Sequence, residues 1–416
     1  MKRARHEGGA LRRAGLARAS SRAVLAATAL LVALVPASAE ASSAGLAKRV
    51  KAAVKPLGSG AAVQVTDLST HRTVVAVRAG RRQPLGSTTK LLTAAAALRR
   101  LGPDTALGTS ALTTGPIDGA GVLAGDLILL GGGDPVLGDA QLSALAAGLA
   151  GVREIAGSVV GDESLFDTVR TGPSGDGAFD AELGGPLSAL AYERGALVPG
   201  GPPQADPARA AAARFDDVLE ARGVRIVGVP RAGATPPGAV PLAAAGSPLL
   251  RTLVRDMLTP SDDWIAELLT KGLAAKVAPP PATTAAGAAI VRAEAARLGA
   301  PVSLVDGSGL DPRDRGTAAG LVSVLRRLRG SASFTAAFAR PGRPGTLEHR
   351  LTSGRARSAC RGKTGTLPSG GVSALAGYCA GRNRHTYAFA VLVQGRDTSK
   401  ARRAQDRVAA ALAAAR

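Results

Sequence analysis

The chain has 416 residues, of which 46% are hydrophobic and 2% aromatic, and its formal net charge is +21. This length and apolar content allow one large folded domain or two smaller ones. The positive charge alone would fit nucleic-acid binding, but the basic residues are mostly arginines scattered along the chain, without a dense cluster or an aromatic stacking array. We therefore expect no nucleic-acid partner.

The first 39 residues are predicted to be a signal peptide. Seven Lys and Arg residues precede the apolar run 23–35, and Ala37-Ser38-Ala39 has the small-x-small form of a cleavage site. The run is too short for a comfortable transmembrane helix. We expect export and cleavage, which lower the net charge to about +15, and an extracytoplasmic location in the periplasm, the wall space or the medium. There the positive charge favours electrostatic association with an anionic wall or membrane surface.

The mature chain is predicted to begin with a helix and two strands. Residues 44–54 have the periodicity of an amphipathic helix, and residues 61–67 and 73–77 have that of strands joined by a polar turn. An apolar, alanine-rich run follows, and Ser87 and Lys90 stand at its start. If this run is helical, the two side chains share a face, because residues three apart are neighbours on a helix.

Ser87 and Lys90 form an S-x-x-K motif that is typical of a serine nucleophile with a lysine base. A free serine is a poor nucleophile, and a lysine in an apolar cleft can take its proton as a neutral amine. Backbone N–H groups at the helix start can stabilise negative charge on an acyl oxygen. The alternative is that Ser87 is a helix cap and Lys90 a solvated lysine of the first turn.

Residues 103–246 differ in composition and are predicted to be an insertion. They contain Gly, Leu and Val in short runs, with strands expected at 126–130 and 157–161, a helix at 207–222 and a Pro/Gly-rich return at 230–241. The stretch from Gly131 to Pro135 lacks the Gly-Lys-Ser/Thr of a phosphate-binding loop. We expect a structural turn there.

A second motif, Ser261-Asp262-Asp263, lies 174 residues after Ser87, where the predicted helices resume. Its serine hydroxyl can relay a proton between nucleophile, lysine and leaving group. The helices are expected near 248–258, 262–275, 284–298 and 316–328. Between the last two, Asp306 to Leu310 either lines the cleft or forms a tight loop held by side-chain hydrogen bonds.

The C-terminal part is predicted to contain three strands near 357–364, 372–380 and 386–393, followed by a helix from Thr398. The third motif, Lys363-Thr364-Gly365-Thr366-Leu367, lies at the end of the first of these strands. Its glycine allows a substrate to approach the strand edge, and Lys363 with the hydroxyls of Thr364 and Thr366 can bind a carboxylate.

Cys360 and Cys379 are the only cysteines of the chain, and export allows a disulfide between them. If the segments on either side of Ser369-Gly370 form a hairpin, the register places the two cysteines opposite each other. Lys363 then points to the other face of the sheet, so the bridge would brace the strand without entering the site. The alternative is two buried free thiols.

The ordered trio of motifs is the signature of penicillin-recognising serine enzymes. Further stretches fall in the order of one such family, and they are 127–135, 157–167, 306–310 and 345–347. On these residues the chain resembles the D-alanyl-D-alanine carboxypeptidase/endopeptidase family of the penicillin-binding protein 4 type, peptidase family S13. The resemblance spans about residues 45–395.

This resemblance implies an α+β protein with the transpeptidase fold of penicillin-binding proteins and serine β-lactamases. Such a fold has a five-stranded antiparallel sheet flanked by helices, here made from the first two and last three predicted strands, and an inserted second domain. The implied division is a signal peptide at 1–39, a catalytic domain at 43–102 and 247–416, and an inserted domain at 103–246.

The resemblance also implies the activity of a serine-type D-Ala-D-Ala carboxypeptidase on peptidoglycan stem peptides, with DD-endopeptidase cleavage of cross-links as a further activity. The implied catalytic residues are Ser87, Lys90 and Ser261, and those that contact substrate are Asp263, Lys363, Thr364, Gly365 and Thr366. β-Lactams are the expected covalent inhibitors. No cofactor is expected, and no metal either, because the four histidines lack H-E-x-x-H spacing.

Asp263 departs from the family pattern, which has asparagine at this position. An ionised aspartate can only accept hydrogen bonds, whereas asparagine also donates one. A carboxylate beside Lys90 would also favour the charged ammonium over the neutral base. Two alternatives follow for the whole chain: a serine β-lactamase, which shares the trio, and a catalytically weak wall-binding pseudoenzyme.

Overall fold

The computed structural model describes residues 37–175, 180–367, 370–395 and 397–416. The predicted signal peptide therefore lies outside the described residues, except for its last three. The first helix, α1 (Ala37–Val54), begins earlier than the predicted residue 44. Within the described part of the chain, no helix has both the length and the hydropathy needed to cross a membrane.

The main sheet has five strands in the order β13-β14-β15-β1-β2, and every neighbouring pair is antiparallel. The strands are β1 (Ala61–Asp67), β2 (Thr73–Val77), β13 (Cys360–Leu367), β14 (Val372–Ala380) and β15 (Thr386–Gln394). The prediction that the first two and last three strands form one antiparallel sheet is confirmed. Both faces of the central strands are buried, which explains why β14 and β15 are apolar almost throughout.

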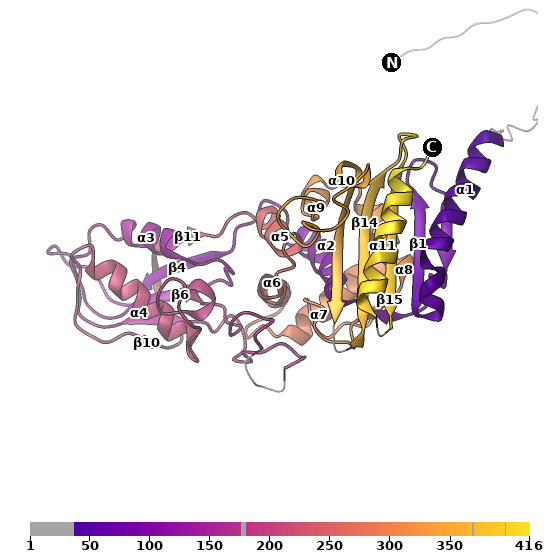
Figure 1. Ribbon diagram of the computed structural model, residues 1–416. Coiled ribbons are helices and arrows are strands. Elements are labelled where there is room, and N and C mark those ends of the chain that lie inside the picture. Colours follow the sequence, from indigo (N-terminus) through magenta and orange to yellow (C-terminus); the bar gives the residue numbers. More distant parts are fainter. Residues whose placement is uncertain (1–36, 176–179, 368–369, 396) are drawn as a thin grey trace, which may run out of the picture. The chain divides into compact units, whose positions relative to one another are not determined.

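Two layers of helices cover this sheet (Figure 1). On one face, Val63, Phe389 and Val391 pack with apolar residues of α1 and of the terminal helix α11 (Thr398–Ala413). On the other face, alanines of β14 and β15 share a core with a second group of helices. These are α2 (Lys90–Arg100), α5 (Leu250–Leu258), α6 (Asp263–Ala275), α7 (Thr284–Arg297), α8 (Ala318–Leu328) and α9 (Ala332–Ala336).

Helix α2 lies at the centre of the helical layer, and every residue from Lys90 to Leu98 is buried. Four consecutive alanines, residues 94–97, leave room for neighbouring helices to approach closely. The predicted helices at 248–258, 262–275, 284–298 and 316–328 are all present within a few residues. Two short helices were not predicted, α9 and α10 (Ala356–Ala359), because one or two turns leave little periodicity in the sequence.

A second sheet, in the order β10-β8-β6-β4-β11, is built from residues between 108 and 246. Its strands are β4 (Gly108–Thr113), β6 (Leu127–Gly131), β8 (Val159–Asp162), β10 (Arg231–Ala232) and β11 (Val240–Gly246). Two helices, α3 (Asp139–Ala147) and α4 (Pro207–Glu220), pack with its core. The predictions of β6, β8 and α4 are confirmed within two residues, while β4, β11 and α3 were missed.

Several very short elements complete the fold. Three two-residue strands form a small parallel sheet, namely β5 (Val122–Leu123), β7 (Glu154–Ile155) and β9 (Arg225–Ile226). Another antiparallel pair is β3 (Gln83–Pro84) with β12 (Arg315–Gly316). The 3-10 helices are η1 (Lys55–Gly60), η2 (Gly86–Thr89) and η3 (Tyr192–Gly195).

Helix α6 connects the segments of the second sheet to the helical layer. The indole Nε1 of Trp264 donates to the carbonyl of Pro135, at 3.0 Å, and the fully buried Lys271 lies 2.5 Å from the Asp167 carboxylate. Pro135 belongs to the glycine-rich turn after β6, in which Gly133 has a φ of +79°. The predicted structural turn is therefore in direct contact with α6.

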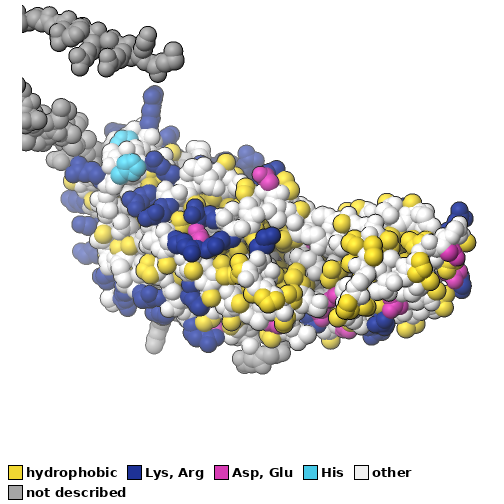
Figure 2. Space-filling view, turned by 180° about the vertical axis from the view of Figure 1, so that it is seen from behind, with side chains coloured by type: hydrophobic (Ala, Val, Ile, Leu, Met, Phe, Trp, Pro, Cys, Tyr) yellow, Lys and Arg dark blue, Asp and Glu magenta, His cyan; other side chains and the backbone are white. Residues whose placement is uncertain are grey.

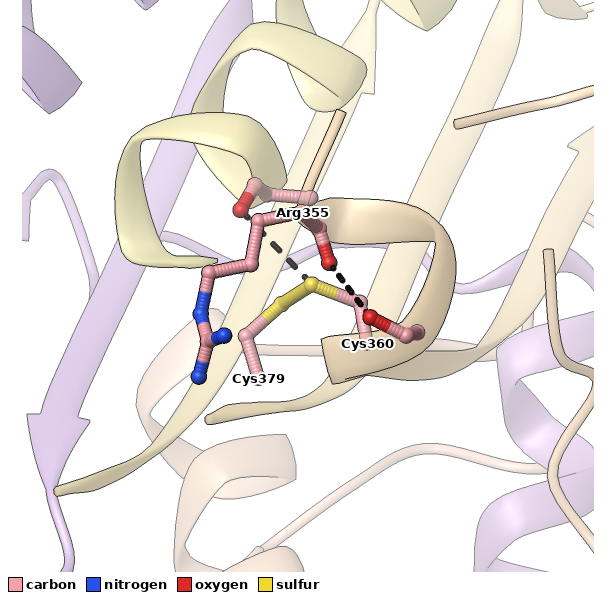
Figure 3. Close-up of a disulfide and its surroundings, with 5 residues drawn as sticks. Arg355, Cys360 and Cys379 are labelled. Atoms are coloured by element: carbon pink, nitrogen blue, oxygen red, sulfur yellow. Dashed lines mark hydrogen bonds between the residues drawn. A yellow bond between two sulfur atoms is a disulfide. The ribbon is translucent and has the colours of Figure 1, made fainter. Parts of the chain in front are cut away.

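A disulfide joins Cys360, the first residue of β13, to Cys379, which pairs directly with it on β14 (Figure 3). The predicted register is confirmed, since Cys360 pairs with Cys379 and Lys363 pairs with Ala376. Cys360 Sγ lies 3.6 Å from the Ala409 carbonyl, so the bridge is on the α11 face of the sheet. The Lys363 ammonium reaches Ser261 on the other side. The disulfide therefore braces β13 away from the side where Lys363 points.

Candidate active site

Ser87 and Lys90 lie close together at the junction of η2 and α2. Lys90 Nζ donates to Ser87 Oγ at 2.9 Å, and the lysine side chain is fully buried. The expectation that the two side chains share a face is confirmed, although Ser87 belongs to the 3-10 turn rather than to the α-helix. The turn begins at Gly86, whose φ of +51° is in the left-handed region that favours glycine.

Lys90 makes two further short contacts, which fix its ammonium in one position. Its Nζ lies 2.5 Å from Asp263 Oδ1 and 2.7 Å from the carbonyl oxygen of Ser308. A charged ammonium has three N–H donors, so these two acceptors and Ser87 satisfy all of them. If Lys90 instead gave up one proton, its lone pair could face the Ser87 hydroxyl, which is the arrangement that a general base requires.

Asp263 is the first residue of α6, and its side chain is only 16% exposed. Burial raises the pKa of this carboxyl, and the attraction to the Lys90 ammonium partly offsets that effect. The sequence placed a carboxylate beside Lys90, and the 2.5 Å contact confirms this placement.

Ser261 and Lys363 form a second hydroxyl–amine pair beside the first. Lys363 Nζ donates to Ser261 Oγ at 2.7 Å and to the Thr364 carbonyl at 2.8 Å. Lys363 is fully buried, and burial together with the nearby charge of Lys90 holds its pKa well below the ordinary range, against the opposing effect of Asp263. The amine of Lys363 therefore gives up its proton more readily than that of a solvated lysine.

The backbone of Ser261 has a φ of +74°, which is uncommon for a residue with a side chain. The next residue, Asp262, caps α6 by accepting from the Ile265 N–H, and its other carboxylate oxygen pairs with Arg194. These contacts hold the turn just before α6, so the unusual backbone directs the Ser261 hydroxyl towards Lys363.

Strand β13 lies tightly against η2, and two glycines make this possible. A Cβ on Gly365 would lie 2.7 Å from the Leu85 carbonyl and 3.2 Å from the Ser87 nitrogen. A Cβ on Gly86 would lie 3.2 Å from the Thr366 nitrogen. The backbone nitrogens of Ser87 and Thr366 are thus near each other, beside the Ser87 hydroxyl.

The two threonines of the third motif differ from Lys363 in their surroundings. Thr364 and Thr366 are half-buried, and Thr366 Oγ1 lies 3.4 Å from a guanidinium nitrogen of Arg402 on α11. Arg402 was not among the predicted site residues. Its sequence neighbourhood is a basic surface helix, so nothing in the local pattern distinguishes it from Arg403.

The segment from Asp306 to Leu310 both forms a tight loop and reaches the site. Asp306 accepts from the Gly309 and Asp311 N–H groups, and the Ser308 carbonyl points to Lys90. Glu267 on α6 accepts from the Gly307 and Ser308 N–H groups at 2.9 and 2.7 Å. The two interpretations of this segment are therefore both correct.

Glu267 was missed by the sequence analysis, although a signal was present. It is a lone acidic residue in the apolar stretch 264–269, four residues after Asp263 and hence on the same helix face. Burial and the nearby charge of Asp306 raise its pKa to about 8. In the ranges that the structure describes, no group of three or more His, Cys, Asp or Glu side chains is arranged to hold a metal ion.

The profile of the D-Ala-D-Ala carboxypeptidase 3 (S13) family matches residues 45–198 and 202–415. The chain belongs to this family. Membership makes it a serine-type peptidase, as its motifs predicted. It is 28% identical to a D-alanyl-D-alanine carboxypeptidase of Actinomadura sp. (strain R39), over 86% of this chain and 81% of that protein.

Solved structures confirm the predicted fold for this S13 chain. Penicillin binding protein 4 (dacB) from Haemophilus influenzae matches with a TM-score of 0.77 at 22% identity, over 88% of this chain and 99% of that one. A predatory peptidoglycan endopeptidase from Bdellovibrio bacteriovorus matches with a TM-score of 0.54 at 17% identity, over 80% and 86%. The fold is the α+β fold of penicillin-binding proteins and serine β-lactamases.

Proposed function

We propose that the chain hydrolyses the terminal D-Ala-D-Ala bond of peptidoglycan stem peptides through an acyl-enzyme on Ser87. The observation that carries this proposal is the 2.9 Å contact between Lys90 Nζ and Ser87 Oγ, in a buried site of an S13 family chain. The Actinomadura relative is named as a carboxypeptidase of this specificity, which supports the same substrate class.

In the first step Ser87 Oγ attacks the carbonyl carbon of the penultimate D-alanine, and Lys90 as a neutral amine takes the hydroxyl proton. The backbone N–H groups of Ser87 and Thr366 stabilise the oxyanion that forms. Ser261 then passes a proton from the lysine side to the leaving D-alanine nitrogen, and the C–N bond breaks. Water hydrolyses the acyl-enzyme in the reverse sense and regenerates Ser87.

Substrate recognition is assigned to the end of β13. The terminal carboxylate of the peptide binds Lys363 and the hydroxyls of Thr364 and Thr366, while Gly365 leaves room for the substrate backbone. Asp263 contacts Lys90 and borders the substrate carbonyl. A β-lactam presents the same carbonyl and carboxylate, so we propose that it acylates Ser87; the Haemophilus influenzae protein has been solved in complex with a β-lactam.

We also propose that the site cleaves cross-linked peptides as a DD-endopeptidase, because the amide bond in the cross-link has the same chemistry as the terminal one. The named activity of the Bdellovibrio bacteriovorus neighbour supports this extension. We place the enzyme outside the cytoplasm, on the signal-peptide pattern of residues 1–39, and its positive charge favours anionic wall or membrane surfaces.

We also propose that residues 43–102 and 247–416 form the catalytic domain and residues 103–246 an inserted domain. Two observations support this division: all strands of the main sheet come from the first two ranges, and all strands of the second sheet come from the third.

The test is covalent labelling of Ser87. Mature protein treated with penicillin is expected to gain the mass of one molecule, and peptide mapping should locate it on Ser87. Ser87→Ala should remove the adduct and the release of D-alanine from an acyl-D-Ala-D-Ala peptide, with the circular dichroism spectrum unchanged. An adduct on another serine, or none with several β-lactams on folded protein, would refute the assignment.

The same samples distinguish the two alternatives. A burst of nitrocefin hydrolysis that stops after about one equivalent supports the peptidase, because water hydrolyses the acyl-enzyme formed with a β-lactam only slowly. Sustained fast turnover would indicate a β-lactamase. Absence of both labelling and D-alanine release in folded protein would indicate a wall-binding pseudoenzyme.

A further inference from the structure

A cavity of about 630 Å³ lies at the start of β13, and none of the candidate active-site residues lines it. Its walls are formed by residues 340–343 on one side and by Gly354 and residues 357–361 on the other. Cavities of this volume are in the range of small-ligand sites. It therefore has room for a group much larger than one water molecule or a single small ion.

The lining of this cavity is strongly basic. Four arginines contribute to it, Arg340, Arg343, Arg357 and Arg361, and no lining residue is acidic. The arginine cavity, as we call it, belongs to the part of the molecule that carries the five-stranded sheet. Lys and Arg side chains are frequent on the face of that part seen in Figure 2, with few Asp or Glu among them.

Several surface arginines of the chain have an acidic partner, and the cavity arginines have none within the described ranges. Arg214, Arg225 and Arg231 each form an ion pair with an Asp or Glu. For Arg340 and Arg357, by contrast, no side-chain hydrogen bond or ion pair is found with any residue that the structure describes. Neither guanidinium therefore has a direct acidic partner among the described residues.

Arg357 reaches both walls of the cavity, and Arg340 and Arg361 are near enough for their charges to interact. A Cβ on Gly342 would lie 3.2 Å from Arg357 Nε, so Arg357 extends from one wall to the other. Arg361 is half-buried and donates to the Thr335 carbonyl at 3.2 Å. Burial and the charge of Arg340 lower the pKa of Arg361, as expected where positive charges meet without a counter-charge.

The backbone around the cavity is fixed rather than loose. The Gly362 N–H donates to the Ala339 carbonyl at 3.0 Å, which attaches the first wall to β13. The second wall includes Cys360, which is bonded to Cys379. Figure 3 shows this disulfide with Arg355 beside it. The backbone that carries the cavity arginines is thus held by a strand contact and by the disulfide.

We propose that the arginine cavity binds phosphate groups of an anionic phosphodiester polymer. Guanidinium groups match phosphate oxygens with paired N–H donors, and they do so better than lysines. A single carboxylate would balance one of the four charges, whereas successive phosphates balance several, and the volume admits more than one group. This site is independent of the proposed peptidase function, and it would hold the enzyme on its wall polymer by direct recognition.

The test compares two double variants of the mature protein by isothermal titration calorimetry with a glycerol phosphate oligomer. Arg340→Gln/Arg357→Gln removes two cavity charges, and Arg209→Gln/Arg222→Gln removes two charges from exposed arginines outside the cavity. We expect the cavity variant to bind about tenfold more weakly or worse, since it loses charge-assisted hydrogen bonds. The control variant should bind within about twofold of the parent, as screened, distant charges contribute little.

Further arms of the experiment identify the ligand class. Pyrophosphate that binds as tightly as the oligomer, with the same loss in the cavity variant, would support a phosphate site but assign it to a free phosphate ligand. Equal weakening in both double variants, or equal binding of polyglutamate, would overturn the proposal, because the attraction would then be a general charge effect or a preference for acidic peptide. Absence of oligomer binding would overturn it as well. Penicillin labelling of Ser87 should be the same in all variants and tests the proposed function separately.

Discussion

At the scale of single residues, the position that most affects the proposed chemistry is Asp263. Its carboxylate is 2.5 Å from Lys90 Nζ, so it stabilises the charged ammonium at the point where a neutral amine is needed. An asparagine would keep an acceptor for Lys90 and add an N–H donor for the substrate carbonyl. The structure thus locates the departure from the family pattern in direct contact with the proposed base.

We predict that Asp263→Asn accelerates acylation by a β-lactam and extends activity to lower pH. A charge-assisted hydrogen bond of about 1.5–3 kcal/mol no longer favours the ammonium, which corresponds to roughly ten- to a hundredfold in rate. The measurement is the second-order acylation rate across pH for both forms.

Asp256→Asn is the control, because it removes one carboxylate from a partly exposed residue of α5 that pairs with Arg255 and does not contact Lys90. It should change the acylation rate far less. If Asp263→Asn is unchanged or slower than the parent, then a protonated Asp263 acts as a donor, in line with its raised pKa, and our account of this residue is wrong.

At the scale of elements, the site depends on how α11 packs beside β13. Arg402 of α11 lies 3.4 Å from Thr366 Oγ1, so it adds positive charge at the strand end assigned to the substrate carboxylate. Arg403, its neighbour in sequence, is also exposed and has no such contact with the third motif.

We predict that Arg402→Gln raises KM for an acyl-D-Ala-D-Ala peptide by about three- to tenfold with little change in kcat. The guanidinium is exposed and its attraction to the carboxylate is screened, so the effect is smaller than for a buried charge pair. It acts on binding rather than on the reacting bond. Arg403→Gln should leave both constants unchanged, and an equal effect of the two variants would show that only the net charge of α11 matters.

At the scale of the whole molecule, buried carboxyls make folding stability depend on pH. Glu267, Asp306 and Asp314 are all buried and lie within or beside the loop that presents the Ser308 carbonyl to Lys90. Burial and neighbouring acidic groups raise the pKa of Glu267 to about 8 and that of Asp314 to about 10. Folding therefore keeps protons that the unfolded chain would release.

We predict that the free energy of unfolding decreases as pH rises from about 5 to about 8. In this window the folded state binds more protons than the unfolded state, which gives a slope of about 1.4 kcal/mol per pH unit for each such group. Glu267→Gln should make the slope shallower and raise stability at pH 8 relative to the parent, as measured by urea unfolding.

Glu294→Gln is the control for this prediction. Glu294 is also buried, but it pairs with Arg99 and Arg100, so its substitution should lower stability at neutral pH instead of raising it. A Glu267→Gln protein with the slope of the parent would mean that Glu267 is ionised in the folded state.

The sequence determined those features that depend on local pattern and on fixed spacing. Ser87 and Lys90 meet because one helical turn brings residues three apart together, whatever the rest of the fold. Cys360 meets Cys379 because the side-chain period of a hairpin fixes which residues face each other. The strands of the main sheet and the long helices could be predicted because their apolar periodicity is sustained over several turns or pairs.

The tertiary structure decided those contacts between distant segments in which at least one partner lies outside the three motifs. The carbonyl of Ser308, the carboxylate of Glu267 and the guanidinium of Arg402 reach the site only because a loop, α6 and α11 pack around α2 and β13. Strands β4 and β11 pair although more than a hundred residues separate them in the chain. The arginine cavity is lined by two segments that are also separate in the sequence. Neither periodicity nor motif spacing carries this information, because such contacts depend on the relative positions of whole elements in the packed fold.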